Sequence, residues 1–199
     1  MGDADTAAPD QQPEVPDEPP DGPQELGESA ADLARQGVDI TALLVAVARS
    51  LRELHATPVD GCPFDASPAA LIAEAADRVE RGKVTIGQFD PPYRRYPPAQ
   101  LLDLVIRSRP PDLDVGNLCL VHGDARLATV RLVDGRVTGW TSLGRCGRGD
   151  PYRDLATMTA DLAGTVSPEA LGPFVDAYGL EHADVLRLDW HVMADQLLR

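Results

Sequence analysis

Apolar residues recur two to four positions apart in several stretches of the chain, which is the spacing of one face of an amphipathic helix. In the second of these stretches, Ser67 precedes Pro68, a pair that favours a helix start because serine can cap and proline suits the first turn. The helices predicted for the first half lie near residues 38–55, 68–82 and 98–108, with a loop over 83–96.

The second half begins with a short apolar run, Leu118 to Val121, which predicts a buried strand. Residues 127–133 and 136–141 flank Asp134-Gly135 and predict a β-hairpin, because Asp-Gly suits a tight turn. Three further amphipathic helices are expected near residues 151–163, 168–179 and 182–198. Helices, a few short strands and then helices predict an α+β, mostly helical fold.

Residues 1–26 differ from the rest in composition, with six prolines, many acids and almost no large apolar side chains. Such a segment cannot bury enough surface to offset its ordering entropy, so we predict a disordered, acidic, proline-rich tail. A partner-binding role for this tail remains an alternative. Residues 27–199 are predicted to form one folded domain.

The net charge of −14 is uneven, because residues 1–36 hold ten acidic residues and one arginine. An acidic balance argues against nucleic-acid binding, which needs basic side chains, and is compatible with weak binding of cationic small molecules. No apolar run approaches the roughly 18 residues of a membrane span. The start of the chain is acidic and unlike a signal peptide, so we expect a cytoplasmic protein.

Cysteines and histidines show no metal-ligand spacing, and the three cysteines are expected to be reduced structural thiols. Cys119 lies in the predicted strand and should be buried and inert. The glycine-rich segment 144–150 matches neither of the common nucleotide-binding glycine motifs.

The most informative motif is His122-Gly123-Asp124, between the predicted strand and the hairpin. Kinase-type phosphotransferases place a catalytic Asp on such a loop, with a magnesium-binding Asn five residues later. A magnesium-binding Asp followed by Gly is expected after the hairpin. This chain has Thr129 and Ser142 at those two positions.

From about Leu54 onward the chain resembles the aminoglycoside 3'-phosphotransferase family. The agreeing stretches occur in family order and spacing: Leu54-His55, Cys62-Pro63-Phe64-Asp65, Arg109-Pro110-Pro111, His122-Gly123-Asp124, Asp134-Gly135-Arg136, Gly144-Arg145, Asp150, Tyr152 and Asp154-Leu155-Ala156. The resemblance implies a protein-kinase-like fold with an ATP-binding N-terminal lobe. Its helical C-terminal lobe would supply the catalytic Asp, the magnesium ligands and an acidic antibiotic site.

The sequence departs from that family pattern in three places. Upstream of residue 37 there is no strand sequence, no phosphate-covering loop and no candidate lysine, since Lys83 is the single lysine. We therefore expect only the C-terminal lobe, with the N-terminal ATP-binding lobe missing. Thr129 and Ser142 bring no charge to the metal positions, so no metal and no cofactor are predicted, although the family would use ATP and magnesium.

The resemblance assigns Asp124 to the catalytic-base position, with His122 in the same motif, and Asp161 to the helix lining the substrate site. Asp189 or Asp195 could add negative charge. Alternatively, Asp124 only braces its own loop; Asp150 and Asp154 are expected to be structural. The ancestral reaction would be ATP-dependent phosphoryl transfer to an aminoglycoside hydroxyl, and we expect a degenerate pseudoenzyme. The alternatives are a non-catalytic binding or scaffold protein and a transferase completed by another chain.

Overall fold

The computed structural model describes residues 26–111, 113 and 118–199. The predicted tail over 1–26 lies outside this part of the chain except for Leu26, whose carbonyl oxygen accepts a hydrogen bond of 2.6 Å from Thr138 Oγ1.

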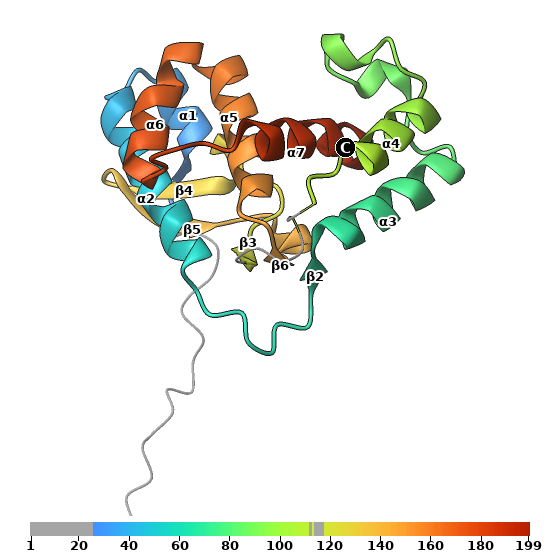
Figure 1. The fold of residues 1–199 in the computed structure, drawn as a ribbon. Coiled ribbons are helices and arrows are strands. Elements are labelled where there is room, and N and C mark those ends of the chain that lie inside the picture. The colour runs from blue at the N-terminus through green and yellow to red at the C-terminus, as the bar shows by residue number, and fades with distance from the viewer. Residues whose placement is uncertain (1–25, 112, 114–117) are drawn as a thin grey trace, which may run out of the picture.

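The helices form two groups joined by the last of them. Figure 1 shows α7 across the middle, with α1, α2, α5 and α6 on one side and α3 and α4 on the other. Their bounds are α1 Ala30–Arg35, α2 Ile40–His55, α3 Pro68–Glu80, α4 Pro98–Arg107, α5 Tyr152–Thr165, α6 Leu171–Tyr178 and α7 Val185–Leu198. The predicted helices are confirmed, and the mostly helical α+β fold with them; α1 was not predicted.

Several stretches that were predicted as loop, strand or helix form short 3-10 turns instead. The expected loop over 83–96 contains two, Ile86–Gln88 and Pro91–Tyr93, around the buried Phe89. The hairpin begins at Val130 rather than Leu127, because Leu127–Thr129 form a 3-10 turn. Two more are Leu143–Arg145 and Pro168–Ala170, the latter preceding α6.

Two small sheets lie beside these helices. The first is antiparallel, β1 (Glu28–Ser29), β4 (Val130–Val133) and β5 (Arg136–Trp140), in the order β1-β4-β5. The second has the order β2-β6-β3, with β2 (Asp65–Ala66) parallel and β3 (Cys119–Val121) antiparallel to β6 (Gly147–Gly149). Asp134 and Gly135 have φ of 50° and 73°, which confirms the predicted hairpin turn.

Strand β6 was missed by sequence reasoning, which treated residues 144–150 only as a failed nucleotide motif. Its glycines are required by close backbone contacts. A Cβ at Gly147 would lie 2.7 Å from the Phe64 carbonyl oxygen, and one at Gly149 would lie 2.6 Å from that of Ala66. Glycine thus allows β2 to approach β6, which fixes the segment leading into α5.

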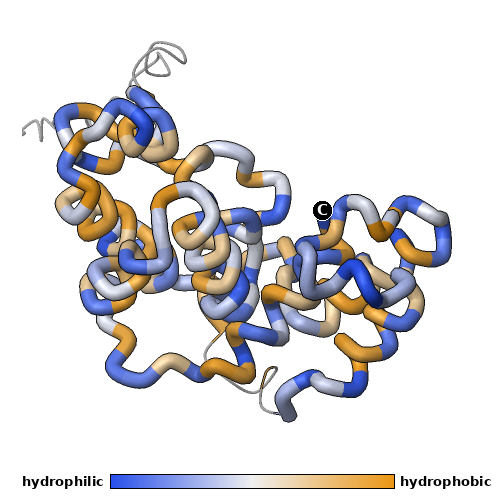
Figure 2. The backbone as a smooth tube through the Cα atoms, turned by 90° about the horizontal axis from the view of Figure 1, so that it is seen from above, coloured by the Kyte–Doolittle hydropathy of each residue, from blue (hydrophilic) through white to orange (hydrophobic). Residues whose placement is uncertain are grey.

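Each helix group has its own apolar core. One core lies where α2, α5 and α6 meet β4, and the other lies among α3, α4 and α7. Figure 2 shows hydrophobic and hydrophilic stretches alternating along the helices of both groups. Trp190 of α7 donates from Nε1 to the Val105 carbonyl oxygen at 2.9 Å, which ties α7 to α4. Among the described residues, no helix is both long and apolar enough to cross a membrane.

A truncation in the first core should test its packing. Leu51 is fully buried on α2, so Leu51→Ala should lower the free energy of unfolding by about 2–5 kcal/mol in denaturant titration. Leu186, 75% exposed on α7, provides the matched control, and Leu186→Ala should change stability by about 0.5 kcal/mol or less. Equal losses in the two variants would contradict this assignment of the core.

Candidate active site

The His122-Gly123-Asp124 loop is held by a buried carboxylate in the first turn of α5. Asp154 accepts hydrogen bonds from the backbone N–H groups of His122 at 2.6 Å and Gly123 at 2.7 Å. His55 Nε2 lies 3.1 Å from Asp154 Oδ2, and His55 Nδ1 lies 2.7 Å from the Tyr178 hydroxyl. The expectation that Asp154 is structural is confirmed, since it links this loop to α2 and α6.

Tight packing leaves little freedom inside the loop. Gly123 has φ of 83°, and a Cβ there would lie 2.2 Å from the Arg145 carbonyl oxygen. Only glycine therefore fits between Asp154 and the 3-10 turn at 143–145.

His122 is fully buried and serves the backbone around it. Its Nδ1 accepts from the Asp124 N–H at 3.2 Å, so the ring proton lies on Nε2, which donates to the Thr141 carbonyl oxygen at 2.8 Å. The ring also packs against Trp140, with centroids 5.2 Å apart. A catalytic part for His122 stays a prediction; these contacts assign it to holding the loop against the end of β5.

Asp124 begins a continuous chain of ion pairs. Its Oδ1 accepts from Arg126 Nε at 2.7 Å, and Arg126 Nη2 lies 3.5 Å from Asp195 Oδ2. Asp195 also accepts from Arg199 Nε at 2.8 Å, and Arg199 Nη1 donates to Asp90 Oδ1 at 2.8 Å. We call these five residues the ion-pair chain. It brings the His122-Gly123-Asp124 loop, the 83–96 segment and the end of α7 together.

A further hydrogen bond holds Asp90, the last residue of the ion-pair chain. Asp90 Oδ2 accepts from Gln196 Nε2 at 2.8 Å. Burial alone would raise the pKa of Asp90, but the hydrogen bonds from Arg199 and Gln196 hold it below its ordinary value. Three carboxylates share two guanidiniums, so the ion-pair chain retains one net negative charge.

The other predicted substrate residues lie outside the ion-pair chain. Asp161 Oδ2 accepts from the Leu127 N–H at 2.9 Å, and its Oδ1 accepts from Thr165 Oγ1 at 3.3 Å. It thereby holds the 3-10 turn after Asp124, and its contact with substrate stays a prediction. Asp189 is exposed on α7 beside Tyr93.

Sequence reasoning missed Arg126 and Arg199 as the cations of this region, which also holds Arg94 and Arg95. In the structure Arg94 donates from Nε to the Phe89 carbonyl oxygen at 2.8 Å, and the Arg95 guanidinium lies over the Tyr96 ring. No sequence signal places Arg199 beside Asp90, since their contact depends on how α7 packs.

Thr129 and Ser142, at the expected magnesium positions, do not form a metal site with their neighbours. Thr129 Oγ1 donates to the Arg126 carbonyl oxygen at 2.9 Å and accepts from the Arg126 N–H at 3.1 Å. Ser142 is exposed, with φ of 65°. Within residues 26–111, 113 and 118–199, no cluster of three or more His, Cys, Asp or Glu side chains could hold a metal ion. The side chains present do not fit Mg²⁺, which prefers carboxylate oxygens.

Cys119 is half-buried rather than fully buried. Burial raises the pKa of its thiol to about 12, so the thiol is protonated at neutral pH and a poor nucleophile.

A second buried carboxylate, Asp150, anchors the start of α5 to α7. It accepts from the Tyr152 N–H at 2.9 Å and from Arg187 Nη2 at 2.8 Å, and His191 Nε2 lies 3.3 Å away. Burial alone would raise the pKa of Asp150, but His191, Tyr152 and Arg187 hold it below its ordinary value. The structural role expected for Asp150 is confirmed.

His191 should make stability depend on pH. Burial lowers the pKa of His191, so the folded protein keeps it neutral while the unfolded chain takes up a proton below about pH 6.5. The unfolded state then binds more protons, and the free energy of unfolding should fall as pH drops from 7 to 5. His191→Gln should flatten this slope in denaturant titrations, whereas His182→Gln, an exposed histidine, should not. Parallel slopes for the two variants would refute the assignment.

Comparisons with known proteins show what this chain is similar to. The model of the phosphotransferase enzyme family matches residues 12–194. An aminoglycoside 3'-phosphotransferase from Escherichia coli is 32% identical over 153 residues, covering 76% of this chain and 54% of the relative. A streptomycin 3''-kinase from Streptomyces griseus is 32% identical over 168 residues, covering 80% and 61%.

Solved structures show the same relationship. A type VIII aminoglycoside-3'-phosphotransferase superposes with a TM-score of 0.75 at 30% identity, covering 86% of this chain and 65% of that one. A Streptomyces rimosus aminoglycoside phosphotransferase in complex with ADP and streptomycin gives a TM-score of 0.75 at 29% identity, covering 87% and 67%. The chain spans 54% to 61% of the length of the two curated relatives above. Because the family model matches residues 12–194, which is most of the sequence, the chain belongs to the phosphotransferase enzyme family.

Proposed function

We propose that the chain is the acceptor-binding part of an aminoglycoside phosphotransferase in which catalysis has degenerated. Its ancestral reaction is ATP-dependent phosphoryl transfer to an aminoglycoside hydroxyl. The observation that carries the proposal is the ion-pair chain running from Asp124 to Asp90, which gathers three carboxylates beside the catalytic loop.

The ion-pair chain supports binding of a cationic amino sugar. An ammonium group can replace a guanidinium beside each carboxylate, because both are cationic donors. The exchange gains little, however, since Arg126 and Arg199 already neutralise most of the charge. The ion-pair chain is therefore proposed to bind aminoglycosides weakly.

Asp124 is proposed to retain the position of a general base. Its carboxylate is about one-third exposed and its loop is fixed through Asp154, so it could orient or accept the proton of an acceptor hydroxyl. The ion pair with Arg126 must open first, because Nε of that arginine occupies one carboxylate oxygen.

Thr129 and Ser142 support the proposed loss of catalysis. Each replaces a charged or strongly coordinating group that would neutralise phosphate charge, and removal of one such group commonly costs about 10²–10³ in rate. Groups that bind the nucleotide would have to come from outside residues 26–199. Phosphoryl transfer depends chiefly on positioning and charge neutralisation, so the described residues alone are proposed to be inactive.

Two other functions remain as alternatives. An active transferase could be completed by a second chain, and would show magnesium-dependent ATP turnover together with a co-purified partner. A non-catalytic binding or scaffold protein would use the ion-pair chain or the acidic tail. Deleting residues 1–26 would abolish partner capture if the tail binds the partner and preserve it if the ion-pair chain does. The three carboxylates of the ion-pair chain favour that surface over the tail.

Titration with kanamycin should test whether the ion-pair chain binds aminoglycosides. We expect a Kd on the order of a millimolar, about 4 kcal/mol, that weakens with salt because exposed charges are screened over about 8–10 Å. Asp124→Asn should weaken binding severalfold, and Arg126→Gln should strengthen it by about tenfold, since it frees a carboxylate. Arg107→Gln, on the exposed face of α4, serves as the control. Micromolar, salt-resistant binding that survives Asp124→Asn would rule out the ion-pair chain as the aminoglycoside-binding site.

Restoring the metal ligands should separate metal binding from catalysis. In Thr129→Asn/Ser142→Asp, Mn²⁺ binding followed by paramagnetic resonance should strengthen, because the pair adds a carboxylate and an amide oxygen near Asp124. ATP turnover should remain at background, since nucleotide positioning is not rebuilt. Turnover in the double variant would overturn the proposed degeneration.

A further inference from the structure

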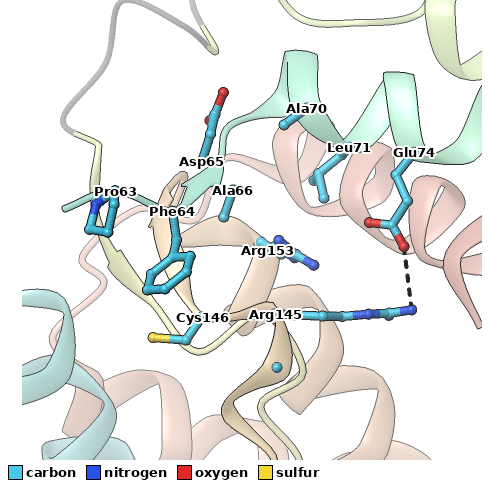
Figure 3. Close-up of a pocket in the computed structure, with 11 residues that line it drawn as sticks. Pro63, Phe64, Asp65, Ala66, Ala70, Leu71, Glu74, Arg145, Cys146 and Arg153 are labelled. Carbon is cyan, nitrogen blue, oxygen red and sulfur yellow. Dashed lines mark ion pairs between the residues drawn. The ribbon is translucent and has the colours of Figure 1, made fainter.

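A pocket of about 290 Å³ lies between β2, the 143–145 turn and α3, and shares no lining residue with the ion-pair chain. Figure 3 shows Arg153 and Arg145 directed into it from one side and Glu74 from α3 on the other. Phe64 and Leu71 contribute apolar surface to its walls. The pocket therefore combines cationic and apolar groups within a small space.

Arg153 is a buried cation with no partner of opposite charge in contact. It is 6% exposed, and within the part of the chain that the structure describes its guanidinium makes neither a hydrogen bond nor an ion pair. Burial lowers the pKa of Arg153 and Arg145 lowers it further, while the nearby Asp154, Glu74 and Asp195 raise it without offsetting the burial. A buried guanidinium is costly unless an anion satisfies it.

The surrounding carboxylates offset this charge only in part. Arg145 donates to the Leu198 carbonyl oxygen and lies 3.7 Å from Glu74, whose side chain is 43% exposed. Asp65 also lines the pocket, but it accepts from the Ser67 N–H at 2.9 Å, and Figure 3 shows its carboxylate pointing away from Arg153. Among the described residues, Glu74 thus ion-pairs with Arg145, whereas no carboxylate ion-pairs with Arg153.

We propose that this pocket binds a small organic phosphate, with Arg153 and Arg145 holding the phosphate group. Guanidinium forks match phosphate oxygens in pairs, and two of them match its charge of nearly −2. The Phe64 ring and the Leu71 side chain supply contact for an apolar body next to the phosphate. Glu74 is then a competing counter-ion that moves away when the ligand binds.

Calorimetric titration of the full chain with phenyl phosphate, in buffer free of phosphate and sulfate, tests the site. Saturable binding is expected, and Arg153→Gln should weaken it by about 10-fold or more, the range for losing a charged hydrogen bond. Glu74→Gln should strengthen it by about threefold, because the competing carboxylate is removed. Arg107→Gln, on exposed α4, should leave it unchanged.

Three results would overturn the proposal. The first is a Glu74→Gln variant that does not bind phenyl phosphate more tightly. This variant decides the matter if circular dichroism shows that Arg153→Gln does not fold. The second is binding that is lost in Arg126→Gln but kept in Arg153→Gln, which would place the phosphate at the ion-pair chain instead. Inorganic phosphate should bind about tenfold more weakly than phenyl phosphate, because it lacks apolar contact. Equal affinity would show a bare phosphate site and refute the organic ligand.

Discussion

The Asp154 carboxylate is the interaction on which the rest of the site depends. It is fully buried and accepts two backbone hydrogen bonds from the His122-Gly123-Asp124 loop, while His55 brings α2 to the same carboxylate. Hydrogen bonds to a charged group contribute about 1.5–3 kcal/mol each, and an unsatisfied buried carboxylate would cost more. The loop position is therefore determined by where α5 begins, and Asp150 and strand β6 determine that in turn.

A loop held in this way fixes the position of Asp124, whatever chemistry follows. Arg126 and Arg199 pair with the three carboxylates of the ion-pair chain, and Thr129 is bonded within its own turn. Asp154, Gly123 and Asp150 stabilise the folded chain directly, because each holds backbone in place. Under the proposed function, the loss of catalysis falls on side chains that make no such contribution to folding.

The sequence allowed prediction of what depends on local pattern. Helical spacing located α2 to α7, Asp-Gly located the hairpin turn, and the His122-Gly123-Asp124 motif located the site. Features that depend on tertiary approach were missed. Strand β6 carries no apolar alternation, because its glycines are required by the backbone of β2.

The charges of the ion-pair chain show the same limit of prediction from sequence. The sequence shows Arg126 two residues from Asp124, but nothing in it indicates that Arg199 of the last turn reaches Asp90. Likewise, the burial of Arg153, 6% exposed and without an ion pair among the described residues, depends on tertiary packing that no local pattern records.

Amide hydrogen exchange at the loop tests the central claim most directly. In the native chain the N–H groups of His122 and Gly123 should exchange slowly, since both are bonded to Asp154. In Asp154→Asn one amide oxygen must serve both, so at least one should exchange about tenfold faster or more, while amides in the middle of α2 should keep their rates. If the N–H groups of His122 and Gly123 exchanged as slowly in Asp154→Asn as in the native chain, with the rates in α2 unchanged, Asp154 would not be what holds the His122-Gly123-Asp124 loop.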